Sequence, residues 1–353
     1  MSPLRRPRSC PATARATLLA AVAPLALAAL TACSSDDVTA PPRPAEGAFT
    51  VDASTGWVYV SLRDSAVVTP TPSAGESAAW DVAFYATNVT LNGGAAGPGG
   101  VTGACVCQNA AATNAEVLAM TPESQRAAFD AVTAVPAGAT FIADVLAPAI
   151  TGWFTGTGTS AAADPGKVFL VRLADSTAFA KVRVAALQGA SATTAGRVTL
   201  EYAVQPAGAA AVGPTRTLDV DVAGGVRSVD LDTGTLTNDA TGWDLRLDGF
   251  TIRVNGGVSG PGKGGATPAP ASFEATTTAS VQANAYRTDS YAGAFGASRY
   301  YRYNIGGDNR ISPTFDVYLV RRGAAVHKLQ VLNYYSTTGQ PRFVTFRYRQ
   351  IAG

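Results

Sequence analysis

Short runs in which apolar and polar residues alternate recur along most of the chain. They occupy residues 57–62, 80–91, 167–173, 180–187, 197–204, 218–222, 226–231, 243–254, 300–304, 317–321, 327–335 and 342–350. The runs are rich in β-branched and aromatic residues, and turn-forming residues separate them, which is typical of strands. Strands that follow strands predict a mainly β fold with antiparallel sheets, sandwich-like or curved.

One segment predicts a helix. Thr121 can cap it, Pro122 suits its first position, and Ala127, Phe129 and Val132 share an inward face up to about residue 134. We therefore expect one or two short helices in each domain.

A long internal repeat organises the chain. Its first copy contains Trp80-Asp81, Asn92-Gly93-Gly94 and Gly97-Pro98-Gly99, and the same residues recur 163 positions later from Trp243 to Gly262. Farther along, 168–172 is echoed by 317–321, 181–184 by 328–331 and 198–202 by 344–348. Each copy has about the size of a domain. The sequence predicts two tandem homologous β domains, 48–205 and 215–353, joined by a linker at 206–214. Within the motif, Asn-Gly also indicates a hairpin turn.

The N-terminus resembles a bacterial lipoprotein signal. Arginines precede a short apolar run, and Cys33 follows Leu-Thr-Ala directly. This pattern predicts a signal peptide at 1–32, a flexible tether at 33–47, and acylation (palmitate) of Cys33. Ser34 after the cysteine favours the outer membrane. An ordinary signal peptide cut nearby is the alternative.

The composition excludes several classes of function and of metal site. Beyond the predicted signal peptide, positive and negative charges nearly balance and are interspersed along the chain, which does not indicate nucleic-acid binding. The single histidine, His327, excludes histidine-rich zinc sites, and no Gly-x-Ser-x-Gly motif accompanies it. Gly257 to Lys263 imitates the start of a phosphate-binding loop, but Gly264 replaces the Ser/Thr that would hold magnesium. We expect no enzyme.

Two cysteines remain beyond the predicted lipid site. Cys105 and Cys107 are two residues apart, close to the upper limit of separation for a disulfide on an extended chain. A bend would allow a local disulfide in the oxidising envelope, and idle thiols are the alternative.

His327 lies in an alternating run with Leu329 and Val331 on the same face. Strand geometry places that face towards the core. The histidine either fills a position at the edge of the core or serves as an axial iron ligand at a pocket mouth.

The second copy resembles the HmuY family of haem-binding envelope lipoproteins. The residues that carry the resemblance are Tyr301-x-Tyr303-Asn304, Phe315-x-Val317 to Arg321, His327 to Val331, Tyr334-Tyr335 and Val344-x-Phe346-x-Tyr348. The Trp-Asp opening with its glycine-rich loop is similar to that family's N-terminal half and occurs in both copies.

The resemblance implies a β fold, a lipid anchor on the outer membrane, and capture of haem for an outer-membrane haem transporter. It also implies two iron ligands, histidines or methionines, and here the chain departs: past the signal it has only His327 and Met120. Tyrosine also ligates haem iron, so we expect haem contacts from His327, Tyr301 and Tyr303. The alternative is a structural or adhesive envelope module that keeps the fold and holds no cofactor.

Overall fold

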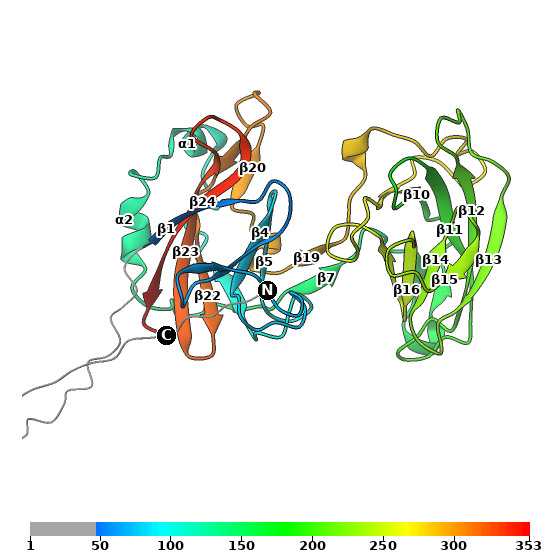
Figure 1. Ribbon diagram of the computed structural model, residues 1–353, viewed down its shortest axis with the longest axis horizontal. Coiled ribbons are helices and arrows are strands. Elements are labelled where there is room, and N and C mark those ends of the chain that lie inside the picture. The colour runs from blue at the N-terminus through cyan, green and yellow to red at the C-terminus, as the bar shows by residue number, and fades with distance from the viewer. Residues whose placement is uncertain (1–46) are drawn as a thin grey trace, which may run out of the picture. The chain divides into compact units, whose positions relative to one another are not determined.

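The computed structural model describes residues 47–353 and is mainly β, as predicted (Figure 1). The predicted signal peptide 1–32, Cys33 and the tether up to residue 46 lie outside the described residues. Gly47, the last residue of the predicted tether, opens the first strand. Within residues 47–353, none of the helices has the length and hydropathy of a transmembrane segment.

One core combines the two ends of the described chain. Its four-stranded sheet has the order β3-β2-β4-β5, and its five-stranded sheet has the order β1-β24-β23-β22-β6. The strands are β1 (Gly47–Asp52), β2 (Val58–Ser61), β3 (Ala66–Val68), β4 (Val82–Tyr85), β5 (Asn88–Leu91), β6 (Thr102–Cys105), β22 (Val317–Arg322), β23 (Ala325–Tyr335) and β24 (Pro341–Ile351). In Figure 1 the blue β1 runs beside the red β24. Phe84 of one sheet stacks on Phe346 of the other with ring centroids 4.9 Å apart, so apolar side chains join the sheets.

A second core is formed by the middle of the chain, and its buried residues run from Ile150 to Ala266. Its four-stranded sheet has the order β15-β14-β16-β17, and its five-stranded sheet has the order β13-β12-β11-β10-β18. The strands are β10 (Val168–Arg172), β11 (Phe179–Gln188), β12 (Arg197–Gln205), β13 (Arg216–Asp221), β14 (Arg227–Asp230), β15 (Thr235–Thr237), β16 (Leu245–Asp248), β17 (Thr251–Val254) and β18 (Gly265–Pro268). The alternating runs of the sequence therefore form strands in both cores.

The two cores share one strand order and one register. Tyr318 pairs with Cys105 across β22 and β6, and the echoed Phe169 pairs with Pro268 across β10 and β18. In each case a strand of one sequence copy pairs with a strand of the other. Each five-stranded sheet thus contains strands from both copies of the repeat.

The predicted linker 206–214 does not separate two units. It connects β12 to β13, which are paired neighbours in one sheet, with Val198 opposite Val220. The described residues, 47–353, all belong to one compact unit. The predicted boundary between 48–205 and 215–353 therefore falls inside the second core, because strand pairing across it joins the two sequence copies.

The repeated motif braces the loop that follows each four-stranded sheet. Asn92 donates from Nδ2 to the carbonyls of Ser77 and Trp80, and its Oδ1 accepts from the N–H of Gly99. Asn255 makes the equivalent three bonds to Thr241, Trp243 and Gly262. Both asparagines are fully buried, so their amides satisfy loop groups that water cannot reach.

The same contacts explain the glycines of the motif. A Cβ on Gly97 would lie 2.1 Å from Oδ1 of Asn92, and one on Gly260 would lie 2.1 Å from Oδ1 of Asn255.

The prediction of a hairpin turn at Asn92-Gly93 is wrong. The turn between β4 and β5 lies earlier in the chain, where Tyr85 pairs with Asn88 and Ala86 has a φ of 49°.

Two crossing segments connect the cores. They contain β7 (Val145–Ala147) and β19 (Ser290–Ala292), which pair antiparallel. The other short elements are β8 (Phe154–Thr155), β9 (Ala162–Ala163), β20 (Tyr301–Tyr303), β21 (Ile311–Pro313), α1 (Asn114–Ala119), α2 (Arg126–Ala131), α3 (Ala294–Ala297), and the 3-10 turns Gly158–Ser160 and Ala283–Ala285.

The predicted helix is present but begins later than expected. Thr121 accepts from the N–H of Ser124 within a turn, and α2 starts at Arg126. Phe129 is fully buried as predicted, whereas Ala127 is exposed. The pattern missed α1, which Thr113 and Glu116 cap reciprocally.

A disulfide joins Cys105 to Cys107, with their Cα atoms 5.0 Å apart. Cys107 has a φ of 54°, and this left-handed conformation supplies the bend that the spacing requires.

Candidate functional site

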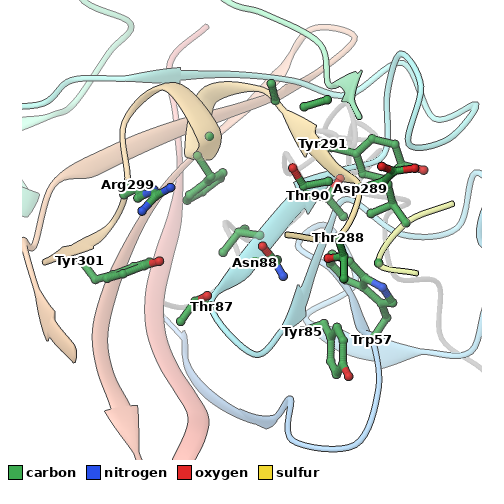
Figure 2. Close-up of a pocket in the computed structure, with 18 of the residues that line it drawn as sticks. Trp57, Tyr85, Thr87, Asn88, Thr90, Thr288, Asp289, Tyr291, Arg299 and Tyr301 are labelled. Atoms are coloured by element: carbon green, nitrogen blue, oxygen red, sulfur yellow. The ribbon is translucent and has the colours of Figure 1, made fainter. Parts of the chain in front are cut away.

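A pocket of about 480 Å³ lies where β5, the glycine-rich loop after β17 and the β19–α3–β20 segment meet (Figure 2). An adjoining cavity of about 350 Å³ shares Trp57, Thr90 and Tyr291 with it. These sizes are typical of small-molecule sites. The site combines residues of both sequence copies.

Aromatic side chains form much of the pocket wall. They are Trp57, Tyr85, Tyr291, Phe295 and Tyr301. Figure 2 shows Trp57 and Tyr85 near one end and Tyr301 near the other. The rings of Trp57 and Tyr85 support each other at a centroid distance of 5.8 Å. Such walls favour a flat, largely apolar ligand.

Three cationic side chains also line the pocket: Arg172, Lys263 and Arg299. Arg172 donates from Nε to the carbonyl of Lys263 at 2.8 Å and lies over the ring of Tyr286, so it fixes the loop. Lys263 and Arg299 are exposed, and neither forms an ion pair within the described part of the chain. The pocket therefore offers two positive groups to a ligand.

The glycine-rich loop owes its position to polar contacts at several points. Asn255 holds Gly262, the N–H of Lys263 donates to the carbonyl of Ala174, and the N–H of Val258 donates to the carbonyl of Asp289. A Cβ on Gly257 would lie 2.0 Å from that same carbonyl oxygen. The repeat motif thus fixes one wall of the pocket.

Asp289 is the one acidic side chain among the pocket residues, and it is buried. Its two oxygens accept from the N–H groups of Ala149, at 2.8 Å, and Val254, at 3.0 Å. Burial raises the pKa of this carboxyl, although the hydrogen bonds oppose the shift. Both oxygens of Asp289 are therefore engaged with the backbone.

The structure brings one of the three predicted haem contacts to the pocket. Tyr301 lines it, and its ring lies 6.0 Å from the guanidinium carbon of Arg299. Tyr303 is 59% exposed outside the pocket, and its hydroxyl donates to Asn309.

His327 lies in the first core and does not line the pocket. It is buried in β23 on the face of Leu329 and Val331, as the alternation predicts. Its Nε2 has no hydrogen-bond partner within the described residues. Burial lowers the pKa of this imidazole, although the charge of Asp81 opposes the shift. The ring is buried here like that of a core residue.

Sequence reasoning missed Trp57, Tyr85, Lys263 and Arg299 as site residues. Their counterparts in the other copy offered a clue. Trp57 corresponds to Val226, Tyr85 to Asp248 and Lys263 to Gly100, as the shared register shows. Aromatic and charged residues that break a repeat are candidates for function.

The side chains that line the pocket offer iron only a limited choice of ligand atoms. No histidine, cysteine or methionine belongs to this pocket, and the described residues contain no group of three or more His, Cys, Asp or Glu placed to hold a metal ion. The phenol oxygens of Tyr85, Tyr291 and Tyr301 remain, and tyrosine is a known haem ligand. Burial raises the pKa of Tyr291 and so disfavours its phenolate. The aromatic lining fits a porphyrin, and Tyr301, which stands beside Arg299, is a candidate oxygen donor.

Comparison with known proteins agrees with the resemblance. Residues 53–202 match the family model for HmuY protein. This segment is similar to the HmuY family. The match spans most of the first sequence copy, from β2 to β12. No curated protein matches the chain.

Several solved structures are similar to this chain. A candidate lipoprotein from Bacteroides fragilis NCTC 9343 is 14% identical with a TM-score of 0.33, covering 86% of this chain and 89% of its own. A candidate HmuY-like heme-binding protein from Bacteroides vulgatus ATCC 8482 is 11% identical with a TM-score of 0.32, covering 86% and 90%. Apo PinO, from Porphyromonas, is 11% identical with a TM-score of 0.32, covering 87% and 96%. Likenesses at this level carry no argument about the ligand.

Proposed function

We propose that this protein binds haem or a related porphyrin, without catalysis, in the pocket between β5 and the β19–β20 segment. One observation carries the proposal: aromatic side chains form the pocket walls, and two cations without ion pairs face the same space. A porphyrin is a flat aromatic ring that bears carboxylates, so it matches both features.

The HmuY family match supports the same ligand class, because it covers the strands β2, β4 and β5 that position Trp57, Tyr85 and Thr90. In this proposal the phenol oxygen of Tyr301 would be the ligand that the chain offers to the iron. The bound haem itself would supply the redox-active iron, and this chain's residues would hold the ring, orient its acidic edge and exclude water from its faces.

Lipid anchoring completes the proposed role. Acylation at Cys33 would hold the protein on the outer membrane, where it passes its ligand to a membrane transporter. A Cys33→Ser variant should leave the membrane fraction, whereas unchanged partitioning would contradict the anchor.

Hemin titration tests the pocket, with the Soret band as the readout. The purified protein should shift the band at one hemin per chain, and Tyr301→Phe should change the band position because the iron loses its oxygen ligand. Tyr303→Phe is the matched control, since it removes an exposed hydroxyl outside the pocket.

Two outcomes would overturn these assignments. No shift beyond free hemin would contradict haem binding and favour the alternative, a structural or adhesive envelope module. A shift lost in folded His327→Ala but kept in Tyr301→Phe would place the iron at the histidine and outside this pocket.

A further inference from the structure

A separate cavity of about 450 Å³ lies along β14, β15 and β16. These strands are neighbours in the four-stranded sheet of the second core (Figure 1). Arg246 lines the cavity and lies between the buried Leu245 and Leu247 of β16. Because side chains alternate along a strand, the cavity lies on the face of the sheet that points away from the core.

Arg246 is held in place by uncharged partners. Its guanidinium carbon lies 4.1 Å from the centroid of the Trp243 ring, and its Nε donates to Oγ of Ser228 at 3.1 Å. Among residues 47–353, the two terminal nitrogens of Arg246 have no hydrogen-bond partner. A fixed guanidinium with both terminal nitrogens available offers a planar fork that matches the oxygens of an anion.

Within the described part of the chain, no acidic side chain forms an ion pair with Arg246. Partial burial lowers the pKa of this guanidinium, and so does the charge of Arg253, which stands opposite it across β16 and β17. Arg253 itself is paired with Asp248 at 2.9 Å. The carboxylate that lines the cavity, that of Asp239, accepts from the N–H and the hydroxyl of Thr241. A bound anion would therefore offset a charge that the fold leaves uncompensated.

Arg227 brings a second cation to the cavity from the adjacent strand β14. Its Nη1 donates to the carbonyl of Val226 at 3.0 Å. Two arginines at one cavity match a phosphate group, which carries more charge and more acceptor oxygens than a carboxylate. Val226 and Leu236 line the same cavity and are 49% and 46% exposed. Their apolar surface suits an apolar substituent on that phosphate.

The first copy carries uncharged residues at the equivalent positions. In the shared register, Ala83 corresponds to Arg246 and Val58 corresponds to Arg227. The ring of Tyr59 packs against the tryptophan of the motif in the first copy, whereas Arg246 covers that tryptophan in the second. The fold therefore does not require the two arginines, and they distinguish one of two equivalent sheet faces.

We infer that this cavity is an anion site: Arg246 and Arg227 bind a phosphate group whose apolar substituent lies against Val226 and Leu236. A soluble phosphate ester and a phospholipid headgroup both present this chemistry. The inference is independent of haem binding, because the cavity and the 480 Å³ pocket have different lining residues.

Calorimetric titration with hexyl phosphate tests the site. The purified protein should bind one hexyl phosphate per chain, more tightly than inorganic phosphate, which lacks the apolar substituent. Arg246→Gln and Arg227→Gln should each weaken this binding about tenfold, as expected when hydrogen bonds to a charged group are lost. Arg246→Lys should also weaken it, because an ammonium group lacks the planar fork. Arg197→Gln is the matched control, since it removes an exposed arginine of β12 outside the cavity.

Vesicles distinguish the two sources of the phosphate. The Cys33→Ser protein is used, so that no acyl chain contributes to the binding. Cosedimentation with phosphatidic acid vesicles, weakened by Arg246→Gln and not seen with phosphatidylcholine vesicles, would identify a lipid headgroup as the ligand. Binding of hexyl phosphate without cosedimentation would identify a soluble ester. Either result supports the anion site.

Three results would contradict the inference. One is a wild-type protein that binds neither hexyl phosphate nor the phosphatidic acid vesicles. Another is a loss of binding in Arg197→Gln as large as that in Arg246→Gln, which would indicate a nonspecific effect of charge. Equal affinity for inorganic phosphate and hexyl phosphate would contradict the apolar part of the site. Arg246→Gln should leave the Soret shift with hemin unchanged, so this inference and the proposed function fail or stand separately.

Discussion

The hairpin β4–β5 in the first core and its counterpart β16–β17 in the second have the same register but different surroundings. At the first, Tyr85 and Thr90 face the pocket. At the second, the corresponding Asp248 and Arg253 form an ion pair at 2.9 Å. A repeated fold thus carries a candidate site at one of two equivalent hairpins.

Apolar contacts cover the second hairpin. Ile150 forms a β-bridge with Ile252, and the rings of Phe154 and Phe250 have centroids 5.0 Å apart. The first hairpin instead meets Arg299 and Tyr301 across an open space. The difference teaches that the sheets specify the scaffold, while a few residues that vary between the copies create the site.

The largest expected effect concerns the exchange of strands between the cores. If a protease site is placed within 206–214 and cut, fragments 47–205 and 215–353 should stay together, because β1 pairs with β24, β22 with β6, β10 with β18, and β12 with β13. Size-exclusion chromatography should show one particle that separates only in denaturant. Two stable separate fragments would contradict the shared sheets.

The next largest effect concerns stability and the two asparagines of the repeated motif, Asn92 and Asn255. Asn92→Ala and Asn255→Ala each remove three hydrogen bonds and leave buried groups without partners, so each should lower the free energy of unfolding by about 3 kcal/mol. Urea unfolding measures this, with the exposed Asn238→Ala as the control.

Hemin affinity should then distinguish the Asn92→Ala variant from the Asn255→Ala variant. Only Asn255→Ala should weaken binding in the folded protein, because its loop lines the 480 Å³ pocket. Equal losses of affinity in both asparagine variants would mean that the loops do not differ in function.

A smaller effect distinguishes the two motif aspartates. Asp81 pairs with Arg322 at 2.8 Å, whereas the corresponding oxygen of Asp244 accepts from the N–H of Ala174. Burial raises the pKa of Asp244 to about 6. Since the folded state then binds the proton more tightly than the unfolded state, the stabilisation from this group is fully present only below the unfolded pKa of 3.8.

That contribution should decline as the pH rises from about 4 to 6, by roughly 1.4 kcal/mol per unit of pKa shift at most. The difference in unfolding free energy between wild type and Asp244→Asn should therefore change across this window. A constant difference from pH 4 to 7 would contradict the raised pKa.

The sequence predicted the strands well because most alternate clearly between apolar and polar residues. It also identified the repeat, the inward side of His327 and the resemblance to HmuY. It could not reveal that β6 pairs with β22 and β18 with β10, since copies of equal pattern pair equally well with themselves or with each other. The domain boundary at 206–214 failed for this reason.

The site was harder to predict for a related reason. Its residues come from segments far apart in the chain, and Trp57 and Tyr85 look like ordinary strand aromatics. Tyr301 was identified through the family resemblance, whereas His327 attracted attention as the single histidine and lies in the core. Helix α2 began late because Thr121 and Pro122 form a turn instead of a cap.

Native mass spectrometry of the protein with hemin tests the central claim most directly, because it counts ligands per chain. The account predicts one hemin bound to the wild type. It predicts none bound to a Trp57→Val/Tyr85→Asp variant, which copies the residues of the second core. Two hemins per chain, or one hemin retained by that variant, would contradict a single site built by the residues that differ between the copies.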